Sequence, residues 1–168
     1  MKKTKQTFAM LCLLALFACQ DRNKTKTGLP SRVYHYVSLD TTALADKHAV
    51  YVPVYSHIYT EDGTTTINLG VTLSVRNTSS VDSFYVTDVV YYGSQGEILK
   101  HYLPSPVIVK PMSSVEFVVE RVESEGGAGA NFVVKWGATK SGIEPLIQTV
   151  MIESAFGISF VTNGIEMK

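Results

Sequence analysis

Apolar and polar positions alternate with a period of two along much of the chain after residue 49. The clearest stretch is 67–75, where Ile, Leu and Val at odd positions alternate with polar or small residues. This period predicts a strand with one buried face. Further strands are predicted at 50–59, 84–92, 98–103, 107–109, 115–120, 131–136, 146–152 and 158–161. The only helical pattern is a single turn near 41–47.

Turn residues separate these runs and indicate how they connect. Asp62-Gly63 lies between 50–59 and 67–75, so these two strands are predicted to form a hairpin. The run 84–92 is apolar on both faces and is predicted to be central, whereas prolines around 107–109 favour an edge strand. Short strands with turns between them are typical of an antiparallel sandwich or barrel. The predicted fold is all-β, an immunoglobulin-like antiparallel sandwich after a helical N-terminal signal peptide.

The N-terminal segment has the order of a secretory signal. Three lysines precede the apolar run 8–18, which is followed by Cys19. The sequence Leu-Phe-Ala-Cys resembles a bacterial lipoprotein box, although Phe17 is bulkier than usual. The apolar run is shorter than the roughly 20 residues that a membrane-spanning helix needs. Lipidation of Cys19 is therefore the predicted anchor; the alternative is cleavage after a small residue, which leaves Cys19 as a free thiol.

This signal divides the chain into a signal peptide (1–18), a lipidated cysteine with a polar tether (19–31) and one sandwich domain (32–168). Cys12 lies in the signal and Cys19 would carry lipid, so no disulfide is predicted. Loss of three lysines leaves 12 basic against 15 acidic residues, a net charge of −3. The chain has no basic stripe, which excludes nucleic acid as a partner. The tether has no acidic run, which favours a periplasm-facing domain; which membrane holds it stays open.

Four sequence blocks, in order, resemble a known bacterial family. They are VYVPVYSHIY at 50–59, LSVRNTS at 73–79, GGAGANFVVKW at 126–136 and MIESAFGISFVTNG at 151–164. Together they are similar to the domain family of unknown function DUF3124, from about residue 49 to 164. The resemblance implies a small exported or lipid-anchored bacterial protein. It implies no activity, cofactor or catalytic residue.

The strand 50–59 carries candidate binding residues. Valines and Ile58 occupy one face, and if that face is core, a polar-tipped aromatic face is left for a partner. Tyrosine suits binding surfaces because it offers area and a hydroxyl at low entropic cost. The alternative is that the segment 33–37 or a second sheet covers this face. The candidate residues are Tyr51, Tyr55, His57 and Tyr59.

The glycine-rich segment 126–131 is a second candidate. Phosphate-binding loops run from a strand into a helix, whereas this segment runs into a predicted strand. A flexible hairpin connection or a bulge is therefore the favoured interpretation. The alternative is a loop that contacts a ligand or partner through Gly127, Gly129 and Asn131.

No catalytic or metal motif is found. The four histidines lack zinc-site spacing and are interpreted as exposed or locally hydrogen-bonded. Asp62-Gly63 fails as a calcium loop because Ile58 and Leu69 would fall at ligand positions. Glu116 and Glu120 would lie about 13 Å apart on a strand, too far for a glycosidase pair. No G-x-S-x-G elbow is present. The sequence therefore predicts no metal, no cofactor and no enzymatic activity.

The function that these features favour is binding. We expect a membrane-anchored envelope lipoprotein, facing the periplasm, that binds another envelope protein or a glycan without catalysis. One alternative is a hydrolase-type enzyme with a site assembled from scattered residues such as His57, Asp88 or Glu97. Another is a purely structural component of the envelope.

Overall fold

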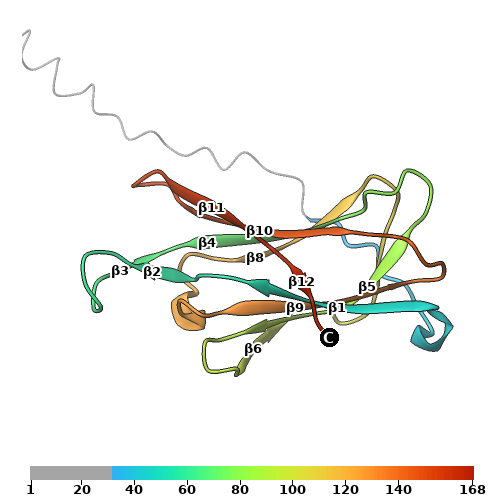
Figure 1. Ribbon diagram of the computed structural model, residues 1–168, viewed down its shortest axis with the longest axis horizontal. Helices are drawn as coiled ribbons and strands as arrows, with labels where there is room; N and C mark the ends of the chain where they lie inside the picture. The colour runs from blue at the N-terminus through green and yellow to red at the C-terminus, as the bar shows by residue number, and fades with distance from the viewer. Residues whose placement is uncertain (1–31) are drawn as a thin grey trace, which may run out of the picture. The chain divides into compact units, whose positions relative to one another are not determined.

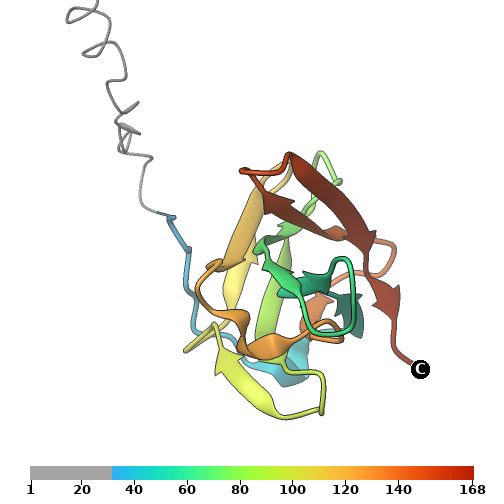
Figure 2. The same cartoon turned by 90° about the vertical axis from the view of Figure 1, so that its left-hand side faces the viewer.

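Two antiparallel sheets, packed face to face, make up the body of the protein (Figure 1). This computed structural model describes residues 32–168. The predicted signal peptide, Cys19 and the tether lie outside the described residues. The view turned by 90° shows the two layers of the sandwich (Figure 2). The predicted all-β sandwich is confirmed.

The first sheet has the strand order β12-β1-β9-β5-β6, and β7 also pairs with β5. Its strands are β1 (Asp46–Pro53), β5 (Phe84–Tyr92), β6 (Ile98–His101), β7 (Val107–Val109), β9 (Asn131–Ala138) and β12 (Ile165–Glu166). The second sheet has the order β11-β10-β4-β8. Its strands are β4 (Gly70–Arg76), β8 (Ser114–Val119), β10 (Leu146–Glu153) and β11 (Ile158–Asn163).

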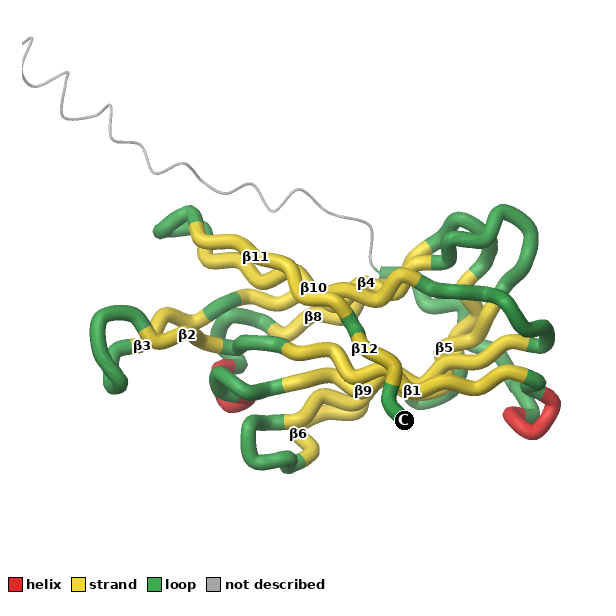
Figure 3. Tube along the Cα trace, in the orientation of Figure 1, coloured by secondary structure: helices red, strands yellow, loops and turns green. Residues whose placement is uncertain are grey.

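The remaining elements are small. β2 (His57–Tyr59) and β3 (Thr66–Asn68) form a two-stranded hairpin, and two 3-10 turns occupy Thr41–Ala43 and Ser124–Gly126. These two turns are the helical segments of the described chain in Figure 3. The first turn is shorter than the predicted 41–47, because β1 already begins at Asp46. Within residues 32–168, no helix is long and apolar enough to cross a membrane.

The strand order matches an immunoglobulin sandwich in its centre and departs from it at its flanks. β4 pairs with β8 and β5 pairs with β9, as strands B with E and C with F do in that fold. The first strand, β1, however, joins β9, and β10 joins β4. In an immunoglobulin domain the first strand lies beside B and the last beside F. The flanking positions are therefore exchanged between the two sheets.

The core forms where the inward-facing residues of both sheets meet. Alternate residues of each strand point inward, as the period of two predicted. Leu73 and Phe117 are fully buried on the second sheet, and Phe84 and Phe132 face them from the first sheet as members of the same apolar cluster. Bringing large rings out of water stabilises the fold, at about 25 cal/mol per Å² of apolar surface.

The predicted hairpin of 50–59 with 67–75 is confirmed only at its tip. His57 pairs with Asn68 and Tyr59 with Thr66, but β1 and β4 belong to different sheets. Both strands bury an apolar face, so they meet across the core and not edge to edge. The separation begins at Ser56, whose backbone N–H donates to Gly127. The hairpin is thus a projection from the sandwich and not a long ribbon.

Candidate functional site

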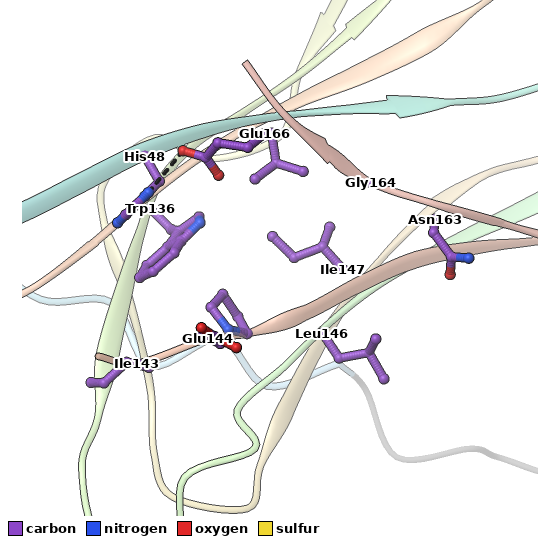
Figure 4. Close-up of a pocket in the computed structure, with 11 residues that line it drawn as sticks. His48, Trp136, Ile143, Glu144, Leu146, Ile147, Asn163, Gly164 and Glu166 are labelled. Atoms are coloured by element: carbon purple, nitrogen blue, oxygen red, sulfur yellow. Dashed lines mark hydrogen bonds and ion pairs between the residues drawn. The ribbon is translucent and has the colours of Figure 1, made fainter. Parts of the chain in front are cut away.

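A hollow of about 480 Å³ opens between the two sheets, where the chain passes from β11 to β12 (Figure 4). Its walls are apolar, and four polar side chains stand among them. The apolar lining consists of Val50, Trp136, Ile143, Pro145, Leu146 and Ile147. The polar lining consists of His48, Glu144, Asn163 and Glu166. An apolar cavity with a few polar groups is the usual form of a small binding site.

His48 and Trp136 form one wall of the hollow. They are direct cross-strand partners on β1 and β9, so their side chains stand on the same face of the sheet. Their rings stack with centroids 4.2 Å apart and planes inclined by 11°. Phe84, which is fully buried, meets the indole edge to face, with centroids 5.6 Å apart. Trp136 is only 5% exposed, and His48 covers one face of its indole.

Two carboxylates hold the imidazole of His48. Its Nδ1 lies 2.8 Å from Glu166 Oε1, and its Nε2 lies 2.7 Å from Asp46 Oδ1. Burial alone lowers the pKa of His48, but the hydrogen bonds and charges of Glu166 and Asp46 outweigh it and raise the pKa above the usual value. Only the protonated ring can donate to both carboxylates at once. The geometry therefore favours an imidazolium stacked on an indole.

Glycine at position 164 allows this arrangement. Its N–H donates to Ile147 on β10, and the next residue already pairs with β1. A Cβ at this position would lie 2.5 Å from Val50 Cγ1. A larger residue would push the chain away from β1 and take Glu166 out of reach of His48. The crossing from β11 to β12 therefore brings the Glu166 carboxylate within reach of His48.

The hollow has an acidic rim. Glu144 and Glu166 line it, and Asp46 stands behind His48, so three carboxylates outnumber one imidazolium. A neighbouring hollow of about 420 Å³ shares His48 and Trp136 but is lined by Lys47 and Lys135. The two hollows therefore differ in the charge of the residues that line them. The acidic hollow suits an apolar group that carries a positive charge.

Asp46 and Glu166 face different nitrogens of the same ring, so the three groups do not converge on one point. In the part of the chain that the structure describes, no cluster of His, Cys, Asp and Glu could hold a metal ion. Both nitrogens of His48 are engaged, whereas a general base needs a free one in reach of its substrate.

The tyrosine residues predicted from the sequence are distributed over several contacts. The valines of the other face are buried, as expected. Tyr55 and Tyr59 are exposed, and Tyr51 and His57 are half-buried. His57 and Tyr59 meet edge to face at 5.7 Å, but Tyr55 packs against Phe160 of β11 at 5.8 Å. Tyr51 pairs with Val133 and Ile165 in the first sheet. The structure brings His57 and Tyr59 together.

The glycine-rich segment connects β8 to β9, which lie in different sheets, so the predicted hairpin connection is wrong. Ser94 donates to the Gly126 carbonyl, Ser56 donates to the Gly127 carbonyl, and the Gly129 N–H donates to Ser94 Oγ at 2.8 Å. A Cβ on Gly126 would overlap the Tyr91 hydroxyl, and Gly127 has φ +79°. Close packing therefore explains these glycines.

The other residues considered from the sequence lie apart from the hollow. Asn131 begins β9, where it pairs with Pro53 and Tyr92. Asp88 lies 3.5 Å from Lys135 Nζ, and Glu97 accepts a hydrogen bond from the Gln95 backbone. Asp88, Glu97 and His57 therefore have separate partners.

The spacing of the histidines predicts only that His48 is exposed or locally hydrogen-bonded. The local bond to Asp46, two residues away, agrees with this interpretation. The contact with Glu166 spans 118 residues. Alternation along β1 predicts that Asp46 and His48 lie on one face of the strand. No local sequence pattern predicts the contact of His48 with Glu166.

These observations define a small all-β sandwich with an apolar, acid-rimmed hollow between its sheets. The chain belongs to the family described as "Protein of unknown function (DUF3124)", whose model matches residues 47–167. The match runs from β1 to β12 and confirms the resemblance seen in the sequence. Comparisons with curated proteins and with solved structures found no match.

Proposed function

We propose that this protein is a lipid-anchored component of the bacterial cell envelope that binds a partner in the hollow beside His48. The anchor is the lipid on Cys19, and the domain faces the periplasm. The signal-like N-terminus supports this location. The acid-rimmed hollow is the observation that carries the binding role.

The chemistry of the hollow favours one class of occupant. Val50, Ile147 and Leu146 offer an apolar surface, and Glu144 and Glu166 stand at its rim. A basic side chain among apolar residues of another envelope protein would match both features. A glycan is favoured less, because sugar stacking needs an exposed ring face and Trp136 is covered by His48.

The geometry supports binding in preference to catalysis. Both ring nitrogens of His48 contact carboxylates. These contacts orient the ring and leave no lone pair on it that could accept a proton from a substrate. The lining offers no serine, threonine or cysteine as a nucleophile. What the site does offer is shape, apolar area and negative charge, which are the requirements of recognition.

Fluorescence of Trp136 tests this proposal, because it is the one tryptophan of the chain. The full chain is titrated with benzylamine, benzyl alcohol and benzoate, which share a ring and differ in charge. Benzylamine should change the emission at the lowest concentration and benzoate at the highest. Equal responses, or none at all, would contradict an apolar, cation-selecting hollow.

Glu144→Gln supplies the matched variant for this titration. The Glu144 side chain has no hydrogen-bond partner among residues 32–168, so the change removes a rim charge without breaking an internal contact. It should weaken benzylamine binding and leave benzyl alcohol unaffected. Glu61→Gln, in the exposed loop between β2 and β3, should alter neither.

The anchor needs a separate test. Cells that express the full chain are labelled with radioactive palmitate, alongside cells that express Cys19→Ser. Label should appear on the first protein and be absent from the second. Unlabelled wild-type chain, or label that persists in Cys19→Ser, would contradict lipidation at this residue.

A further inference from the structure

The two edges of the second sheet differ in how their backbone groups are satisfied. At the β8 edge, the Asn77 N–H donates to Ser113, so residues 114, 116 and 118 direct their backbone groups away from β4. Two tyrosine hydroxyls occupy this edge. Tyr34 donates to the Glu116 carbonyl at 2.8 Å, and Tyr102 donates to the Val118 carbonyl at 2.9 Å. This edge is therefore blocked to another strand.

The β11 edge has no such cover. The Gly164 N–H donates to Ile147, so the alternation of an antiparallel ladder directs residues 158, 160 and 162 toward β10. Ser159, Val161 and Asn163 then direct their N–H and C=O groups outward, and all three are exposed. No other residue of 32–168 forms a hydrogen bond with these backbone groups. They are available to a further strand.

The composition of this edge is unusual for an exposed strand. Edge strands are normally protected by charges, prolines or bulges. Here no charged residue and no proline occurs between Glu153 and Glu166. Val161 is 54% exposed and lies directly opposite Val150, which is exposed on the same outer face of the sheet. The edge is thus open, uncharged and bordered by apolar side chains.

We propose that β11 is a docking edge for a second copy of this chain, in which β11 pairs antiparallel with β11. With Val161 on the two-fold axis, Ser159 faces Asn163 of the second copy, and every outward backbone group of these three residues finds a partner. The Val161 side chains of the two copies therefore face each other on the axis, and the polar side chains of Ser159 and Asn163 face each other on either side of it.

The absence of charge favours a second copy over a different protein. Like charges directly opposite each other would oppose self-pairing, and β11 carries none. The same edge offers an acidic or basic strand no complementary charge. Self-pairing joins the two four-stranded sheets into one continuous sheet. Asn163 belongs both to this edge and to the lining of the hollow, whereas Ser159 and Val161 do not line the hollow.

A cysteine placed on the axis tests the register. Residues facing each other in a hydrogen-bonded antiparallel pair have Cα atoms about 5.5 Å apart, within the range of a disulfide. The full chain with Val161→Cys, oxidised in membranes, should convert to a covalent dimer. Val122→Cys, on a loop residue that is 82% exposed, should stay monomeric. The wild-type chain controls for Cys12 and Cys19.

The mass of the detergent-solubilised full chain tests the same interface without a crosslink. Wild type and Val122→Lys should be dimers. Val161→Lys should be a folded monomer with the circular dichroism spectrum of the wild type, because two lysines would meet on the axis. A monomeric wild type, a dimeric Val161→Lys, or equal crosslinking at positions 161 and 122 would overturn the proposal.

Discussion

His48 lies face to face with Trp136, with ring centroids 4.2 Å apart, although the two residues are on strands that are distant in the sequence. The stack fixes the plane of the imidazole, and Asp46 and Glu166 fix its two nitrogens. One side chain thereby joins β1, β9 and β12. The acidic hollow depends on this junction, because His48 and Glu166 both line it.

The contact between His48 and Glu166 should stabilise the fold in a pH-dependent manner. The folded state raises the pKa of His48, so this stabilisation is fully present below the unfolded pKa of about 6.5 and is lost as pH rises through the higher folded value. Glu166→Gln should therefore lower the melting temperature more at pH 6 than at pH 9. Thermal unfolding by circular dichroism measures this difference. An equal loss at both pH values would refute the imidazolium contact.

Glu153 should show the opposite dependence. This buried carboxylate accepts a hydrogen bond from the Phe156 N–H at 2.8 Å, which is the largest cause of its lowered pKa, and it also pairs with Arg121. A lowered folded pKa gives stability that is present above the unfolded value, near 4.3, and is lost as pH falls through the folded one. Glu153→Gln should destabilise the protein at pH 7 and have less effect at pH 3. Urea unfolding at the two pH values provides the comparison.

The tyrosine caps of β8 should contribute measurably to stability. Burial raises the pKa of Tyr102, so its hydroxyl stays protonated and donates to the Val118 carbonyl. Tyr102→Phe should cost about 1 kcal/mol in the free energy of urea unfolding. Tyr59→Phe changes an exposed tyrosine and serves as the control, with an expected effect near zero. Indistinguishable losses would mean that the cap contributes nothing.

The packing of Gly126 against Tyr91 should appear as coupling between two substitutions. The Tyr91 hydroxyl is buried and has no hydrogen-bond partner in the described chain, so Tyr91→Phe should leave stability unchanged or raise it slightly. Gly126→Ala should destabilise, because its Cβ would overlap that hydroxyl. In the Tyr91→Phe background the loss should be smaller. Equal losses in both backgrounds would show that the hydroxyl is not the obstacle.

The sequence predicted the strands because their alternation is local. The inward positions of β8, such as Phe117, and of β9, such as Phe132, follow directly from a period of two. The order of the flanking strands was not predictable in the same way, since burial of one face does not determine which strand lies beside it. The short Asp62 turn was recognisable, but the separation of β1 from β4 was not.

The hollow was missed for a related reason. Its walls come from β1, β9, β10, β11 and β12, and its acidic rim joins His48 to a carboxylate 118 residues away. Catalytic and metal motifs are recognised in a sequence by residues that lie close together along the chain. Around His48 only Asp46 is such a neighbour, because Glu166 is distant in the sequence. The aromatic residues of 50–59 carried the prediction of a binding face; His57 and Tyr59 contact each other there, and Tyr55 packs against Phe160.

Photocrosslinking in intact cells decides whether the hollow holds a partner. A photoreactive amino acid replaces Leu146, a lining residue that is 41% exposed, and a second chain carries it at Val122 as a control. Position 146 should give a discrete adduct with an envelope protein, which position 122 does not give and which weakens when Glu144→Gln is added. The absence of an adduct at position 146, or the same adducts from both positions, would contradict a binding role for the hollow.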